Sequence, residues 1–210
     1  MVVIHYTAMK SAEAARDWLC NPEAQVSAHY VIAEDGRIWQ LVDEAARAWH
    51  AGAGQWGSCT DVNSRSIGIE LSNLGTHPFA EPQMAALESL LKGILARWTI
   101  PPERVIGHSD MAPGRKIDPG PRFDWQRLAR QGLAVWPDAL HSLAHSATDS
   151  PLEAALAAIG YTCDVPLDTR LSAFRSRFNR AATGPATQAD LAIAQSLAAR
   201  FPVDRGQGSA

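Results

Sequence analysis

Two histidines at the ends of apolar runs, and an aspartate in the loop that follows one of them, could bind one metal ion. His5 lies at the end of the run that starts at Val2, and His108 directly follows a second run, residues 104–107. Asp118 comes ten residues after His108, beyond a Gly- and Pro-rich stretch that predicts a turn-rich loop. Three nitrogen or oxygen ligands, with a fourth position left to water, are typical of a catalytic zinc site. A lone histidine is also common in a core, so His5 needs the other two residues to indicate a site.

Two further ionisable residues could act beside such a metal. Glu70 stands inside the apolar run 66–71, where a carboxylate is unusual unless it is paired or functional. The alternative is an edge-strand carboxylate that faces water. Glu70 could accept a proton from zinc-activated water and pass it to a leaving group. Lys116, two residues before Asp118, could stabilise an oxyanion with its ammonium group.

The elements that must position these residues alternate irregularly between strands and helices. Asp35-Gly36 between two β-rich runs predicts a hairpin, and apolar residues at helical spacing from Met84 to Trp98 predict an amphipathic helix. The predicted strands cover residues 2–6, 28–33, 37–42, 66–71 and 104–107, and the predicted helices cover residues 11–20, 84–99 and 125–131. This pattern indicates an α/β domain, with a mixed central sheet flanked by helices, over residues 1–136.

A small helical unit is predicted in the C-terminal part of the chain. Residues 137–150 are polar with little periodicity, and we interpret them as a linker. Residues 151–210 form the second domain, with three short helices predicted at residues 151–160, 169–179 and 187–201. About 55 residues in three helices can bury only a small core, so we expect this unit to lean on the first domain.

The composition limits the partners of the protein. A net charge of −3 with no large basic block argues against nucleic-acid binding. No apolar run approaches the roughly 18 residues of a membrane span, and the first residues do not read as a signal peptide. The three cysteines show no disulfide or zinc spacing, which favours a reducing compartment. We expect a monomer that binds neither nucleic acid nor membrane.

Five segments, in this order, resemble the zinc-dependent N-acetylmuramoyl-L-alanine amidases, which share a fold with the peptidoglycan recognition proteins. The segments are Ile4-His5-Tyr6-Thr7, Ser27-Ala28-His29-Tyr30, Ala48-Trp49-His50-Ala51-Gly52, Ser66-Ile67-Gly68-Ile69-Glu70-Leu71, and residues 107–120. The resemblance covers residues 1–136 and implies hydrolysis of the amide between the lactyl group of N-acetylmuramic acid and L-Ala of the stem peptide. It departs at the N-terminus, because family members usually carry residues before the first strand. Either the start is trimmed here, or part of the cover of the groove is absent.

The resemblance also implies a role for each candidate residue. Zn²⁺ would be bound by His5, His108 and Asp118. Glu70 would be the catalytic carboxylate, and Lys116 would stabilise the oxyanion.

The remaining candidates concern the substrate groove. The resemblance places His29 and His50 at positions that line the groove rather than bind metal. Trp49 lies at the start of a Gly-rich loop, which suits either a ligand wall or a loop packed down by its own tryptophans. The C-terminal helices resemble, less specifically, three-helix peptidoglycan-binding domains. The alternative is a helical appendage that shields the catalytic domain.

We expect a cytoplasmic zinc hydrolase that cleaves small muropeptides, including the 1,6-anhydro form, in cell-wall recycling. If the given N-terminus is trimmed, an exported periplasmic amidase that acts on intact peptidoglycan is the alternative. A non-catalytic muropeptide-binding module is a second alternative, which a catalytic carboxylate and lysine argue against. A zinc peptidase that cuts within the stem peptide is disfavoured because the sequence has no HExxH.

Overall fold

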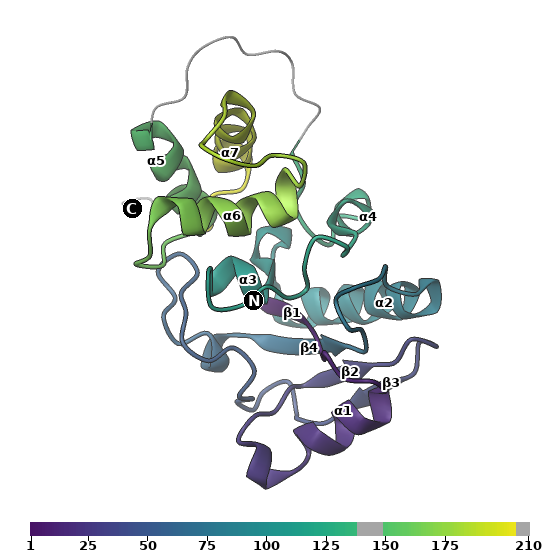
Figure 1. Cartoon of the computed structure of the whole chain (residues 1–210). Helices are drawn as coiled ribbons and strands as arrows, with labels where there is room; N and C mark the ends of the chain where they lie inside the picture. The colour runs from purple at the N-terminus through teal and green to yellow at the C-terminus, as the bar shows by residue number, and fades with distance from the viewer. Residues whose placement is uncertain (138–148, 205–210) are drawn as a thin grey trace.

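The computed structural model describes residues 1–137 and 149–204, so most of the predicted linker lies outside the described residues. Five strands form one sheet in the order β3-β2-β4-β1-β5 (Figure 1). They are β1 (Val2–Tyr6), β2 (Tyr30–Ile32), β3 (Ile38–Gln40), β4 (Ile67–Leu71) and β5 (Val105–Gly107). The strands pair in parallel except at the β2–β3 hairpin, which is antiparallel. The predicted mixed sheet is confirmed.

The alternation of side chains along β1 and β4 divides the sheet into two faces. Val2 and Ile4 of β1 join one buried cluster, and Val3 joins the other. His5 therefore points to the same face as Val3, because side chains two residues apart share a face. Glu70 is the register partner of His5 on the neighbouring parallel strand, so both polar side chains leave the sheet on this face.

One face of the sheet is covered by the long helix α2 (Glu81–Trp98) and by α4 (Trp125–Arg130). Apolar residues of α2 at helical spacing, such as Leu87, Leu91 and Ile94, have no exposed surface and pack against the strands. The Asp124 side chain accepts the Arg127 N–H at 3.0 Å and so begins α4. These helices confirm the predicted amphipathic pattern.

The other face carries the polar residues and the C-terminal helices. These are α5 (Asp149–Ile159), α6 (Leu167–Phe178) and α7 (Gln188–Arg200), which lie over α3 (His108–Met111) in Figure 1. Leu156, Phe174 and Leu197 share a buried cluster with Val3 and Ile106 of the sheet. The helical unit thus packs directly on the sheet, in line with its small size.

The remaining elements are short. Helix α1 (Ala12–Leu19) begins at Ser11, whose hydroxyl accepts the Ala14 N–H, and it contacts β2. Three 3₁₀ helices complete the described elements: η1 (Pro22–Ala24), η2 (Asn63–Arg65) and η3 (Pro102–Arg104). In the described part of the chain, no helix is both long and apolar enough to cross a membrane.

Candidate metal centre and active site

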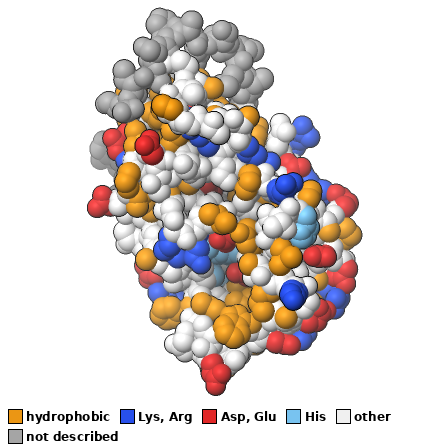
Figure 2. All heavy atoms as spheres, viewed as in Figure 1, with side chains coloured by type: hydrophobic (Ala, Val, Ile, Leu, Met, Phe, Trp, Pro, Cys, Tyr) orange, Lys and Arg blue, Asp and Glu red, His pale blue; other side chains and the backbone are white. Residues whose placement is uncertain are grey.

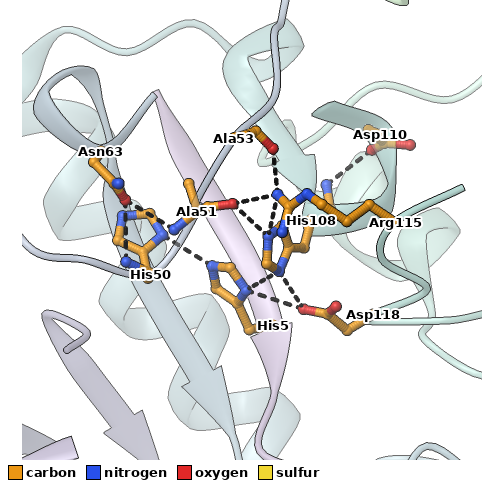
Figure 3. A network of polar contacts seen from close by, with 10 residues as sticks. His5, His50, Ala51, Ala53, Asn63, His108, Asp110, Arg115 and Asp118 are labelled. Carbon is orange, nitrogen blue, oxygen red and sulfur yellow. Dashed lines mark hydrogen bonds and ion pairs between the residues drawn. The ribbon is translucent and has the colours of Figure 1, made fainter. Parts of the chain in front are cut away.

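Three side chains meet at the end of β1 (Figure 3). The Nδ1 atoms of His5 and His108 lie 2.9 Å apart, and Asp118 Oδ2 lies 3.0 Å from the first and 3.1 Å from the second. All three residues are buried. The sequence predicted a turn-rich loop after β5, but the chain forms the single helical turn α3 there. This turn carries His108 at its first position, and the Ser109 N–H donates to the Asp118 carbonyl at 2.9 Å.

The geometry of these three atoms fits a bound cation. Two imidazole nitrogens and a carboxylate oxygen converge on one point. A single proton there could form a hydrogen bond between only two of these three atoms. A tetrahedral zinc ion with bonds of about 2.0–2.1 Å would hold neighbouring ligand atoms about 3.3 Å apart, close to the separations found here. Burial raises the pKa of Asp118, but the bonds to His108 and His5 outweigh it and hold that pKa well below its usual range. The carboxylate is therefore charged and ready to bind a cation.

The Ala51 carbonyl orients His108. Its Nε2 lies 2.8 Å from the Ala51 carbonyl, so Nε2–H donates there and leaves Nδ1 free as a ligand. Arg115 Nη2 donates to the same carbonyl at 2.6 Å and also to the Ala53 carbonyl, which fixes this loop beside the site. The asparagine Asn63 anchors the loop from behind, since its Oδ1 accepts the Ala51 N–H at 2.8 Å.

A chain of polar groups orients His5. Its Nε2 lies 3.0 Å from His50 Nδ1, and His50 Nε2 lies 3.2 Å from Ser66 Oγ. The Ser66 hydroxyl donates to the Val62 carbonyl, so it must accept the hydrogen bond from His50, and this fixes the direction of each hydrogen bond in the series. Nε2–H of His5 then donates to His50, and Nδ1 of His5 is left as a ligand. Gly68 makes room for this arrangement, because a Cβ there would lie 2.4 Å from His50 Cγ.

Glu70 lies beside the three ligands in surroundings that favour its neutral form. Burial, and then the negative charge of Asp118, raise the pKa of Glu70 from 4.5 to about 8, while Lys116 lowers it. Its Oε2 is buried and has no hydrogen-bond partner among the described residues. A carboxylate with a raised pKa and an unused oxygen is suited to proton transfer.

The three ligands and Glu70 line a groove of about 530 Å³. Figure 2 shows histidine and acidic side chains in a hollow bordered by basic and hydrophobic side chains. Lys116 and the exposed side chains of Trp18, Trp49 and Ile117 form part of the wall. The groove thus joins a charged centre to an apolar rim.

The family N-acetylmuramoyl-L-alanine amidase matches residues 1–121 of the chain. The chain belongs to this family. The family that the five segments indicated is confirmed, and the protein is an amide hydrolase of this class.

The chain is similar to three named relatives, AmiD, AmpDh3 and AmpD. AmiD from Escherichia coli K12 is 38% identical over 97% of this chain and 84% of its own length. The solved complex of that AmiD with anhydro-N-acetylmuramic acid-L-Ala-D-γ-Glu-L-Lys matches 96% of this chain and 89% of AmiD, with a TM-score of 0.86. AmpDh3 from Pseudomonas aeruginosa, solved with anhydromuramic pentapeptide, is 31% identical over 96% of this chain and 92% of its own, with a TM-score of 0.83. AmpD from Haemophilus influenzae is 42% identical over 50% of this chain and 58% of that protein. The predicted fold class is confirmed.

The residues predicted to bind substrate occupy different places in this amidase. Trp49 is 57% exposed on the rim of the groove, with the Arg47 guanidinium 4.4 Å over its ring. His50 lines the groove but uses both ring nitrogens in the chain behind His5. His29 has no exposed surface: the Gly68 N–H donates to its Nδ1 at 2.9 Å, and its Nε2 lies 3.1 Å from the Ala46 carbonyl. The structure does not bring His29 to the groove surface.

Sequence reasoning missed the residues that support the ligands. Asn63 begins the 3₁₀ helix η2, Ser66 directly follows that helix, and Arg115 lies in a turn, all places where polar residues are ordinary. The sequence carries no signal for Asn63, because a buried asparagine needs partners but its burial is known only from the folded structure.

Proposed function

We propose that this amidase binds zinc through His5 Nδ1, His108 Nδ1 and Asp118 Oδ2, and hydrolyses the bond between N-acetylmuramic acid and L-Ala in muropeptides. The observation that carries the proposal is the convergence of three buried ligand atoms, within 3.1 Å of one another, beside Glu70 in an open groove. A non-catalytic binding module would need neither this cluster nor a carboxylate with a raised pKa.

The chain's own residues would divide the chemistry between them. A zinc ion bound here would polarise the scissile carbonyl and lower the pKa of bound water to about 7. Glu70 would take a proton from the attacking water and give it to the amide nitrogen as the carbon–nitrogen bond breaks. The products are the lactyl carboxylate and the free amino group of L-Ala. Lys116, on the wall of the same groove, would stabilise the negative charge that develops on the carbonyl oxygen.

The substrate form follows from the relatives. AmiD and AmpDh3 were solved with anhydromuramyl peptides, and both match nearly the whole of this chain. We therefore propose that small muropeptides, including the 1,6-anhydro form, are the substrates here, as in cell-wall recycling. Cys20, Cys59 and Cys163 form no disulfide, which supports the cytoplasm as the compartment.

The domain division is also a proposal. Residues 1–136 would form the catalytic domain, since they contain every residue of the candidate site. Residues 151–210 would form the helical domain, and its binding to peptidoglycan rests on the resemblance to three-helix peptidoglycan-binding domains.

One assay would test both the chemistry and the substrate. Purified anhydromuramyl tripeptide and intact sacculi would be incubated with the zinc-loaded wild type, Glu70→Gln and His108→Ala, and the products identified by mass spectrometry. We expect free anhydro sugar and peptide from the wild type, with faster release from the small substrate. Glu70→Gln should keep its zinc and lose about 10²- to 10⁴-fold in rate, because general acid–base catalysis typically contributes that much. His108→Ala should lose the metal itself.

Three results would oppose the proposal. If the wild-type protein retained no zinc after dialysis, the proposed zinc site would be wrong. Near-normal turnover of Glu70→Gln would assign proton transfer to another residue. Faster release of peptide from sacculi than from the anhydromuramyl tripeptide would favour the exported enzyme and leave the amidase chemistry intact.

A further inference from the structure

A buried carboxylate in the helical turn α3 receives hydrogen bonds from both halves of the molecule. Asp110 Oδ1 accepts the Tyr161 hydroxyl at 2.6 Å, and Oδ2 accepts Arg177 Nη1 at 2.7 Å and the Gly107 N–H at 2.8 Å. The Asp110, Tyr161 and Arg177 side chains are almost completely inaccessible to solvent. Tyr161 and Arg177 both belong to the C-terminal helical unit, so that unit supplies two of the three donors to Asp110.

These contacts surround the metal ligand His108. Gly107 precedes it, and the Asp110 side chain accepts the Gly107 N–H at the start of the same turn. Arg177 Nη2 also donates to the Val105 carbonyl at 3.2 Å, in the strand that leads to His108. The same turn holds the second ligand, because the Ser109 N–H donates to the Asp118 carbonyl. Any shift of α3 would therefore move both His108 and Asp118.

Contacts other than this ion pair also join the two halves. A shared cluster of buried apolar residues already joins the helices to the sheet, and the Thr162 hydroxyl donates to the Gly57 carbonyl at 2.7 Å. A buried ion pair gives little stability over well-packed apolar residues, because both charges lose their hydration. The Arg177 guanidinium offsets part of that loss by lying 3.9 Å over the Trp125 ring. What the pair adds is a fixed geometry at the turn of the ligands.

We propose that Arg177 and Tyr161 are positioning residues for the metal centre: through Asp110 they fix α3, so that His108 and Asp118 meet His5 in binding geometry. The inference rests on the zinc site proposed above. It gives the C-terminal helices a part in the catalytic centre, although they contribute no ligand to it. Groups that hydrogen-bond a metal ligand typically change metal affinity about 10- to 100-fold when they are removed, and Arg177 and Tyr161, which act through Asp110, should reach the lower end of that range.

The test compares matched variants of the full chain. Tyr161→Phe removes one hydroxyl that reaches Asp110, and Thr162→Val removes the neighbouring hydroxyl that reaches Gly57 instead. Arg177→Met breaks the pair with Asp110, and Arg175→Met breaks the buried pair with Asp190 inside the helical unit. Zinc affinity would be measured by competition with a chelator, and ligand geometry by the visible spectrum of the cobalt-substituted proteins. Thermal unfolding would record any loss of stability separately.

We expect Tyr161→Phe and Arg177→Met to bind zinc about 10-fold more weakly, with a changed cobalt spectrum. Arg177→Lys should restore part of the affinity. Thr162→Val and Arg175→Met should keep wild-type zinc affinity even where they unfold at a lower temperature. Equal zinc affinity of the Tyr161→Phe and wild-type proteins would overturn the inference, and this milder variant decides if the arginine variants do not fold. A wild type that binds no zinc would instead remove the proposed function.

Discussion

At the scale of single residues, Glu70 shows how much the site depends on a bound cation. Burial and the nearby charge of Asp118 favour the neutral acid, with a pKa of about 8. A cation on the three ligands would offset the charge of Asp118 and lower the pKa of Glu70. In the metal-free protein, Glu70 should therefore be mostly protonated at pH 7.

This protonation predicts a specific pH dependence of stability in the metal-free protein. A carboxyl group whose pKa is raised by folding contributes stability below its unfolded pKa, and that contribution is lost as the pH rises through the folded pKa. For Glu70 the window runs from 4.5 to about 8. Glu70→Gln stays neutral, so its melting temperature should rise relative to the wild type across this window, by on the order of 10 °C at pH 8.

The measurement is thermal unfolding of both proteins in EDTA from pH 5 to 9. The pKa of His5 is lowered to about 4 and that of the N-terminal amino group to about 6, mainly by burial. These groups raise stability as the pH increases, but they do so in both proteins, so the difference between the two isolates Glu70. A difference in melting temperature that stays constant with pH would contradict the assignment.

The two histidines and Glu70 could be selected from the sequence because their types contrast with apolar neighbours, and Asp118 because it lies in the loop that follows His108. Two histidines at the ends of apolar runs, and a glutamate inside one, stand out in any reading of residue types. The structure brings these residues together, although their roles remain proposals. The resemblance placed both His29 and His50 on the groove, but only His50 lines it. His29 is buried between the Ala46 carbonyl and the Gly68 N–H, and these contacts leave no local pattern in the sequence.

At the scale of elements, alternation along the strands brings the polar residues to one face. The five strands and the β2–β3 hairpin followed from apolar runs and from Asp35-Gly36. The strand order did not, because parallel pairing joins segments far apart in the chain and leaves no local pattern. The turn α3 was also missed: it is four residues long, too short for helical periodicity to appear.

Strand β4 needs a glycine at position 68 so that the His50 ring can lie against it. We expect Gly68→Ala to displace His50, since the new Cβ would lie 2.4 Å from its Cγ. His5 would then lose the partner of its Nε2, and zinc affinity should fall about 10-fold. Overpacking of this kind should also lower the free energy of unfolding by about 1–3 kcal/mol.

Chelator competition and denaturant unfolding would measure the two effects. Gly93→Ala in α2 is the matched control, because its Cβ would meet only the end of the flexible Arg97 side chain. That change should leave zinc affinity unaltered and raise helix stability by up to about 1 kcal/mol. Unchanged zinc affinity in Gly68→Ala would show that His50 does not orient His5.

At the scale of the whole molecule, the C-terminal helices and the catalytic sheet share one buried cluster. Val3 of β1, Ile106 of β5 and Met111 of α3 have no exposed surface, and all three pack in this cluster with residues of α5, α6 and α7. The sequence predicted that the helical unit would lean on the first domain, since so few residues bury little apolar surface. It could not predict that the contact would fall on the face that carries the metal ligands, because this face follows from the strand order.

A chain that ends at Trp136 should therefore lose more than a binding appendage. Each apolar side chain that such a truncation exposes would cost about 1.5–3 kcal/mol, and Asp110 would lose Arg177 and Tyr161 as partners. We expect the truncated protein to aggregate, or to melt far below the full chain, and to bind zinc weakly.

A chain that ends at Asp204 is the control, because it keeps the bonds of Asp204 to Ser58 and Arg104. Thermal unfolding, size-exclusion chromatography and chelator competition would compare the three proteins. A truncated chain that stays monomeric and binds zinc as tightly as the full chain would mean that the helices are dispensable for the metal centre.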